Sequence, residues 1–182
     1  MNELGDRIPI PPKDSMNTGL SPAKASTMLM KLGKPGKLTK DCSDPIGKFK
    51  KRIKFGVDVG PFKVSGLDFA VESLRQIFLE VQQQLPDVFS HVKTEGMLCV
   101  RHRRKAPLLF SNHSFGTAID LFFGAKVVGQ GVHLTHRGNF LLFPFFNRHG
   151  WYWGAEFSGD FVDSMHFELA EETILKLPDT PL

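Results

Sequence analysis

Residues 111–121 read SNHSFGTAIDL, and this stretch decides how the chain is interpreted. His113 and Asp120 are seven positions apart, and the loop after His113 can form a tight turn in which Gly116 supplies backbone freedom. Asp120 then lies on an expected strand at residues 117–123 (TAIDLFF). An unpaired carboxylate in such an apolar strand would be costly. The spacing therefore predicts that a loop side chain and a strand side chain face one point.

A second block, DSMHFE at residues 163–168, places Asp163 three positions before His166 in a segment that turns into a strand. Zinc prefers neutral imidazole and carboxylate ligands, and a catalytic site needs three protein ligands and a further position for water. His166 could be a ligand and Asp163 the acceptor of a proton from the attacking water, which is the pairing that metal-assisted hydrolysis requires. A lone DxxH motif or a lone buried histidine is more often structural, so neither block decides the function by itself.

Together the two blocks resemble a known superfamily. SNHSFGTAIDL is similar to the SxHxxGxAxD signature of the zinc D-Ala-D-Ala carboxypeptidases and the related L-alanyl-D-glutamate endopeptidases, which share their zinc-site fold with the Hedgehog signalling domain. WYWGAEFSGDFVDSMHFE at residues 151–168 resembles the second block of that superfamily. GMLCVR at residues 96–101 resembles the strand that brings an arginine to the zinc loop. The blocks occur in the superfamily's order.

The resemblance implies a role for each of five residues. His113, Asp120 and His166 would bind Zn²⁺, Asp163 would be the general base, and Arg101 would stabilise the oxyanion. Aspartate at the base position is similar to the endopeptidase branch that is found in phage lysins. The implied function is zinc-dependent hydrolysis of peptidoglycan stem peptides by an L-alanyl-D-glutamate endopeptidase. The alternatives are a D-alanyl-D-alanine carboxypeptidase and a non-catalytic Hedgehog-like zinc-binding module; Asp163 and Arg101 together count against the module.

The clearest helix is predicted after Ser65, in GLDFAVESLRQIFLEVQQQLP. Ser65 is the expected cap, Asp68 lies in the first turn, and Pro86 follows the end. Apolar residues recur on one stripe at helical spacing, namely Leu67, Ala70, Val71, Leu74, Ile77, Phe78, Val81 and Leu85.

The remaining pattern predicts strands and helices in no regular alternation. We expect strands within residues 91–100 and 117–123, a short buried helix at 139–150 that contains Pro144, a loop that leads from Trp151 into a last strand, and a closing helix at 170–177. The pattern indicates an α+β protein whose antiparallel sheet has flanking helices. Within the α+β class, the resemblance implies a fold of the Hedgehog/DD-peptidase type.

Residues 1–62 are interpreted as a Pro/Gly-rich N-terminal arm and residues 63–182 as the peptidase domain. Within the arm, SPAKASTMLMKLG predicts a short helix that Ser21 caps and Gly33 ends. Residues 24–54 carry ten Lys/Arg and two Asp, whereas the whole chain has a net charge of only +4. This basic stretch could bind an anionic polymer or lipid or be a solvated linker. It lacks interleaved aromatics, so no nucleic-acid partner is expected.

The rest of the composition indicates where the protein works. Cys42 and Cys99 lie in no CxxC or Cys/His array, which favours two ordinary thiols, although pairing is left open. The N-terminus lacks the basic and apolar regions of a secretory signal, and no segment could span a bilayer. We therefore expect a monomer that is made in the cytoplasm and acts on the cell wall after release or delivery, as a phage lysin or an injected toxin.

Several charged residues have open roles. Glu168 could orient His166 or be a solvated strand residue. Arg103, Arg137 or Arg148 could each bind the free carboxylate that a carboxypeptidase must recognise. The remaining histidines are expected to have surface or hydrogen-bonding roles, namely His91, His102, His133, His136 and His149.

Overall fold

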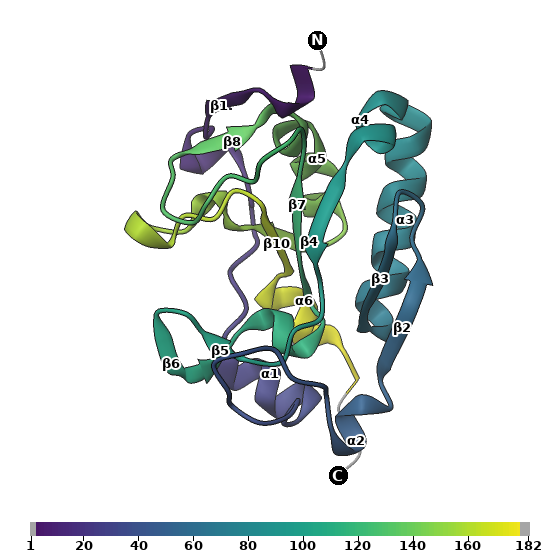
Figure 1. Ribbon diagram of the computed structural model, residues 1–182, viewed down its shortest axis with the longest axis vertical. Helices are drawn as coiled ribbons and strands as arrows, with labels where there is room; N and C mark the ends of the chain where they lie inside the picture. Colours follow the sequence, from purple (N-terminus) through teal and green to yellow (C-terminus); the bar gives the residue numbers. More distant parts are fainter. Residues whose placement is uncertain (1–2, 179–182) are drawn as a thin grey trace.

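The computed structural model describes residues 3–178 and has the predicted α+β architecture. Its central sheet is antiparallel, with the strand order β4-β7-β10-β9 (Figure 1). The strands are β4 (Lys93–Gly96), β7 (Ala118–Phe122), β10 (His166–Leu169) and β9 (Trp151–Trp153). The prediction of strands within 91–100 and 117–123 is confirmed. The prediction of a loop from Trp151 onward is wrong for three residues, because Trp151–Trp153 pair with β10 and form an edge strand.

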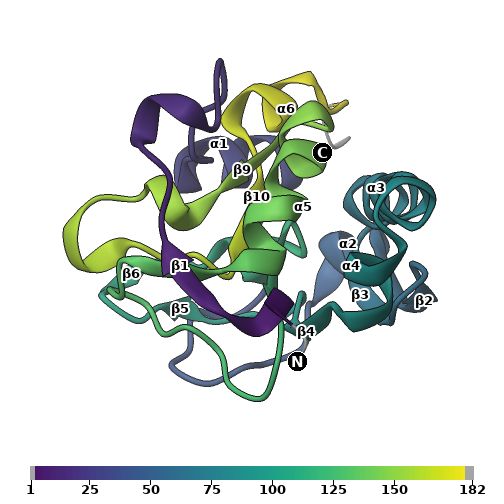
Figure 2. The same ribbon diagram turned by 90° about the horizontal axis from the view of Figure 1, so that it is seen from above.

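The apolar stripe after Ser65 and the Phe-rich segment at residues 139–150 each predicted a helix, and both helices are present. Helix α3 (Asp68–Gln84) buries the predicted stripe, and α5 (Arg137–Arg148) contains Pro144. In Figure 2, α5 lies over the sheet, and its Phe146 packs on Phe167 of β10 with ring centroids 4.4 Å apart. Phe78 of α3 meets Phe146 edge-on at 6.1 Å. The aromatic core thus joins both helices to the face of the sheet opposite Asp120.

The prediction that Ser65 caps the N-terminus of α3 is wrong. Ser65 belongs to strand β3 (Lys63–Leu67), and its hydroxyl accepts a hydrogen bond from the Gly56 backbone N–H. The chain remains extended through residue 67 because β3 pairs with β2 (Ile53–Asp58), so Leu67 occupies the cap position. Pro86 does follow α3, as the first residue of α4 (Pro86–His91). Strand pairing therefore outweighs the local capping signal.

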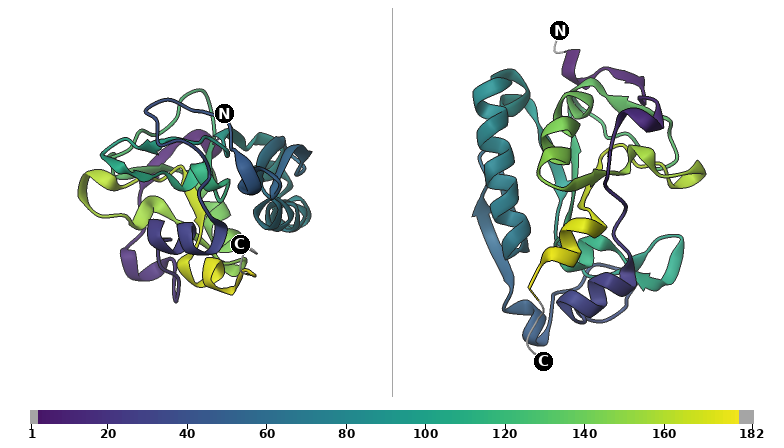
Figure 3. Two further views of the ribbon diagram at one scale, coloured as in Figure 1. Left: turned by 90° about the horizontal axis from the view of Figure 1, so that it is seen from below. Right: turned by 180° about the vertical axis from the view of Figure 1, so that it is seen from behind.

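The N-terminal residues pack along the rest of the molecule. Strand β1 (Arg7–Pro9) pairs with β8 (Leu134–His136), and the following segment runs from β1 to α1 (Ala25–Leu32) (Figure 3). Gly33 ends α1 with a φ of 78°, as predicted, but Ser21 does not cap it: Lys24 occupies the cap position, and the Ser21 N–H donates to Glu172. Closing helix α6 (Glu171–Lys176) accepts further hydrogen bonds from this segment through Glu171.

The remaining elements are short. They are α2 (Gly47–Lys50), the hairpin strands β5 (His102–Arg103) and β6 (Ala106–Phe110), and five 3-10 turns: η1 (Glu3–Gly5), η2 (Lys13–Ser15), η3 (Asn112–Phe115), η4 (Gly154–Glu156) and η5 (Gly159–Phe161). Within residues 3–178, no helix is long and apolar enough to cross a bilayer.

The interpretation of the two cysteines as ordinary thiols is wrong. Cys42 and Cys99 form a disulfide, with their Cα atoms 5.0 Å apart. The adjacent residues Ser43 and Val100 form an isolated β-bridge, which brings the loop after α1 against the segment between β4 and β5. The cysteines are 57 residues apart, so this pairing depends on a tertiary contact that their spacing does not reveal.

Candidate metal centre

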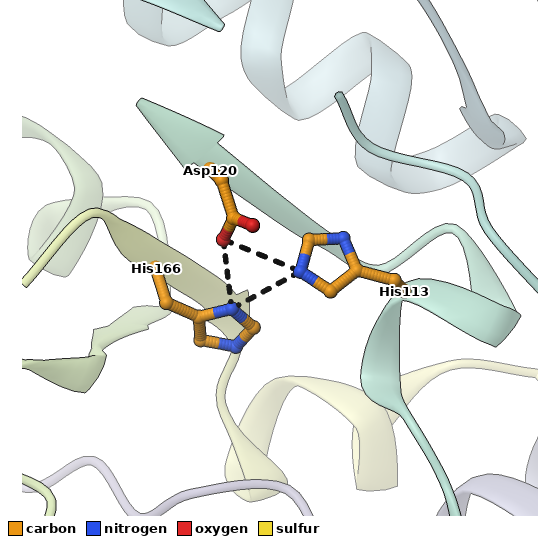
Figure 4. A group of neighbouring side chains, drawn as sticks. All are labelled: His113, Asp120 and His166. Carbon is orange, nitrogen blue, oxygen red and sulfur yellow. Dashed lines mark hydrogen bonds and ion pairs between the residues drawn. The ribbon is translucent and has the colours of Figure 1, made fainter. Parts of the chain in front are cut away.

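Three side chains foreseen from the sequence converge on one point (Figure 4). His113 lies in η3, while Asp120 of β7 and His166 of β10 are directly opposite each other in the strand register. Gly116 ends η3 in the left-handed conformation, with a φ of 60°, and a Cβ there would lie 2.7 Å from the Gly66 backbone. The loop therefore needs glycine to turn tightly enough to bring His113 beside β7.

The distances within this triangle suit a tetrahedral metal site. The Nε2 atom of His113 is 3.2 Å from Nδ1 of His166 and 3.3 Å from Oδ1 of Asp120, and the last two atoms are 3.1 Å apart. Bonds of about 2.0–2.1 Å from a central zinc to tetrahedral ligands place neighbouring ligand atoms about 3.3–3.4 Å apart. Ligand type and spacing both fit zinc, with a fourth position left for water or substrate.

Hydrogen bonds on the far sides of the two imidazoles fix which nitrogens face the centre. Nδ1 of His113 lies 2.9 Å from the carbonyl oxygen of Met97 and must donate to it. Nε2 of His166 lies 2.7 Å from Oε2 of Glu168. When both imidazoles are neutral, the remaining ring nitrogens direct lone pairs toward the carboxylate of Asp120; a protonated imidazole donates to that carboxylate instead. Such a triangle of acceptors requires a proton or a metal cation between them.

The pKa values of Asp120 and His166 also indicate that the triangle favours a bound cation. Burial alone would raise the pKa of Asp120, but attraction and hydrogen bonding from His113, and then from His166, hold it well below its usual value. Burial alone would lower the pKa of His166, but its hydrogen bonds to Asp120 and Glu168 raise it well above the usual value. The site thus keeps its carboxylate ionised and attracts positive charge.

Glu168 orients His166 and is not a solvated strand residue, because only 2% of it is exposed. Its Oε2 also accepts a hydrogen bond from the Asn112 side chain at 2.6 Å, and its Oε1 accepts the backbone N–H of Ala23 at 2.9 Å. Sequence reasoning did not identify Asn112, Met97 or Ala23 as supports of the centre. Asn112 adjoins His113 in the SNH motif, but nothing local indicates that it reaches Glu168.

Asp163 lies in the loop before β10 and is largely buried. Its Oδ1 has no hydrogen-bond partner within the described part of the chain. Burial raises the pKa of this carboxyl group to about 6; the charge of Asp120 adds to the effect, whereas His166 and His113 oppose it. The carboxylate therefore experiences the field of all three triangle residues and keeps a free oxygen, which is what a proton acceptor beside the centre needs.

Arg101 lies immediately before β5, between the bridge residue Val100 and His102, and not on a strand as the resemblance implied. Its backbone is held by the Ser114 hydroxyl, which accepts from the Arg101 N–H at 3.0 Å and donates to its carbonyl at 2.7 Å. The half-buried guanidinium donates to the His102 carbonyl. Burial and then the charge of Arg104 lower the pKa of Arg101, whereas the charge of Asp120 raises it.

The three arginines that could bind the free carboxylate of a carboxypeptidase substrate lie in different environments. Arg103 donates to the Phe110 carbonyl and to Oδ1 of Asn112, and Arg148 forms an ion pair with Glu80 at 3.2 Å. Arg137 is exposed at the start of α5. Hydrogen bonds hold four of the other histidines as predicted, namely His91, His102, His136 and His149.

Comparison with known proteins concerns the segment that carries the metal triangle. No curated protein and no solved structure matches the chain. A peptidase family model described as D-alanyl-D-alanine carboxypeptidase matches residues 104–169. This range includes His113, Asp120, Asp163 and His166 but begins after Arg101. The match spans less than half of the chain, includes the whole candidate metal triangle, and supports a metallopeptidase of this family.

Proposed function

We propose that this chain is a zinc-dependent peptidase that cleaves stem peptides of bacterial peptidoglycan. The observation that carries the proposal is the triangle of His113, Asp120 and His166, whose far sides are fixed by hydrogen bonds, with Asp163 beside it. A structural site has no need of a carboxylate in its field that keeps one buried oxygen without a hydrogen bond. The matching peptidase family model supports the same class of substrate.

When bound, zinc would polarise the scissile carbonyl and make the attacking water more acidic. Asp163 accepts the proton of that water and passes it to the leaving amine. In the metal-free protein, burial raises the pKa of Asp163 to about 6, so its carboxylate is a stronger base there than an ordinary aspartate. Arg101 contributes a permanent positive charge that favours the oxyanion over the planar peptide.

For the bond that is cut, we propose the L-alanyl-D-glutamate linkage, an internal position. Arg103 and Arg148 are engaged by Asn112 and Glu80, which leaves fewer cations to bind the free carboxylate of a terminal D-alanine. The description of the matching family model favours the alternative, a D-alanyl-D-alanine carboxypeptidase. Mass spectrometry of wall fragments after digestion separates them: new glutamate amino termini support the endopeptidase, and loss of single alanines supports the carboxypeptidase.

The roles of Asp163 and the triangle are tested separately. Asp163→Ala should still bind one zinc per chain but release no peptide fragments from purified sacculi. Asp160→Ala is a matched control, since Asp160 lies in the same loop but is exposed. Undiminished cleavage by Asp163→Ala would refute its role as base. Wild-type protein that holds zinc and leaves a panel of wall peptides intact would favour the non-catalytic binding module.

The proposal includes a setting and an organisation. We propose a fold of the Hedgehog/DD-peptidase type, with an arm at residues 1–62 and a peptidase domain at residues 63–182, acting as a monomer on the cell wall after release or delivery. The pairing of β1 with β8 and the hydrogen bond from Ala23 to Glu168 support an arm that is packed on the domain. A phage lysin and an injected toxin both fit this setting.

A further inference from the structure

The molecule has a strongly basic end. We call it the basic end face and define it as α1, the loop at residues 33–46, α2, and the first residues of β2, which together occupy the lower end in Figure 1. These elements fall within residues 24–54, which carry ten Lys/Arg and two Asp, whereas residues elsewhere are net negative. The charge is therefore concentrated on one end of the fold.

Most of the lysines on this face have no counterion within residues 3–178. Six exposed lysines enter no ion pair with the described part of the chain, namely Lys34, Lys37, Lys48, Lys50, Lys51 and Lys54. Like charges so arranged repel one another and favour an anionic partner. Coulomb attraction alone would suit a phosphate polymer, a nucleic acid or an anionic lipid surface.

Apolar side chains on the same face separate these partners. Met30 of α1 is 67% exposed, Phe55 of β2 is 53% exposed, Ile46 beside α2 is 50% exposed, and Leu38 of the connecting loop is 39% exposed. A hydrophilic polymer has no place for aliphatic side chains, and a nucleic acid would need more than one ring on which bases stack. Lysines interspersed with protruding apolar residues are what an anionic bilayer interface accommodates.

We propose that the basic end face docks on an anionic phospholipid bilayer, with its lysines among the headgroups and Met30, Ile46 and Phe55 at the acyl boundary. The inference does not depend on the proposed peptidase activity. Docking would also orient the candidate metal centre, because this face is fixed to it: Cys42 is bonded to Cys99, and the Cys99 N–H donates to the carbonyl of His113. The centre would therefore be held in one orientation relative to the bilayer.

The test is flotation of the full-length protein with vesicles. Vesicles of phosphatidylcholine with about 30% phosphatidylglycerol should bind it at least about ten-fold more tightly than phosphatidylcholine alone. Lys48→Glu/Lys51→Glu should reduce that binding about ten-fold or more. Lys63→Glu/Lys126→Glu removes the same charge outside the face and should leave binding within about two-fold. An equal loss of vesicle binding in the two double variants would overturn the proposal, since binding would then depend only on the net charge of the protein.

A second comparison isolates the apolar contribution. Met30→Ser/Ile46→Ser keeps every charge and should weaken vesicle binding about three-fold or more while leaving retention on a sulfated cation-exchange matrix unchanged. Unchanged vesicle binding by this variant would overturn insertion. Tight binding to lipoteichoic acid or DNA with none to anionic vesicles would overturn the choice of partner. Circular dichroism and zinc content verify that each variant is folded, so that loss of binding reports on the face.

Discussion

Replacing Asp163 with asparagine should stabilise the metal-free protein at pH 8. Burial, the largest contribution, raises the pKa of Asp163 from 3.8 to about 6, so the folded protein holds this proton more tightly than the unfolded chain does. Stability from this group is therefore lost as the pH rises from about 4 to about 6, and the full cost remains above that window. Asparagine is neutral at every pH and escapes the cost.

The magnitude follows from the size of the shift. Two pKa units correspond to about 3 kcal/mol, and the residual exposure of this largely buried carboxylate reduces the expected gain to about 1–2 kcal/mol. The orphaned Oδ1 makes no hydrogen bond that the substitution would break. Hydrolysis, in contrast, should fall by about 10²-fold or more because the amide cannot accept the proton.

Urea denaturation in EDTA at pH 8 and pH 4 measures this gain. The variant should be more stable at pH 8, and the difference should shrink near pH 4, where the wild-type carboxyl group is protonated in the folded state. Added zinc should reduce the difference at pH 8, since a neighbouring cation favours the carboxylate. The kcat/KM of the wild type should rise with pH until the Asp163 carboxyl group is ionised. This plateau should begin at or below about pH 6, because bound zinc lowers the pKa of that group. A variant that is less stable at pH 8, or that hydrolyses normally, would refute the reasoning.

Three further predictions concern the supports of the site. Glu168→Gln should weaken zinc binding about 10–100-fold in a competition titration with a chelator, because it alters the partner that orients His166; wild-type affinity would contradict this. Reducing the Cys42–Cys99 disulfide should lower the free energy of unfolding by up to about 4 kcal/mol, because it frees a long loop. Urea unfolding curves with the same midpoint with and without reductant would contradict this prediction. Arg101→Lys should retain zinc and lower kcat about ten-fold in a peptide-release assay, and an unchanged kcat would assign the oxyanion to another group.

Local patterns in the sequence predicted the elements and residues whose causes are local. The apolar stripe of α3 recurs at helical spacing along its 17 residues, and packing against α5 and the β2–β3 hairpin enforces it. His113, Asp120 and His166 were predicted because the two sequence blocks that carry them resemble a known superfamily, and in the structure the turn at Gly116 and the register of β7 with β10 bring them together. The family model that matches residues 104–169 covers all three.

Features that depend on distant partners could not be predicted from the sequence. Cys42 meets Cys99 only because Ser43 bridges to Val100, and Ala23 supports Glu168 from 145 positions away. Ser65 carries a valid capping signal, but pairing of β3 with β2 keeps the chain extended past it. Each failure has the same cause, which is a tertiary contact that outweighs local preference.

The central claim is that His113, Asp120 and His166 hold a zinc ion that is required to cleave wall peptides. The direct measurement is zinc content together with mass spectrometry of fragments released from purified sacculi, for wild type and Asp120→Ala. We expect one zinc per wild-type chain, new peptide termini, and loss of both in the variant. Normal peptide release by a variant that holds no zinc would contradict the account.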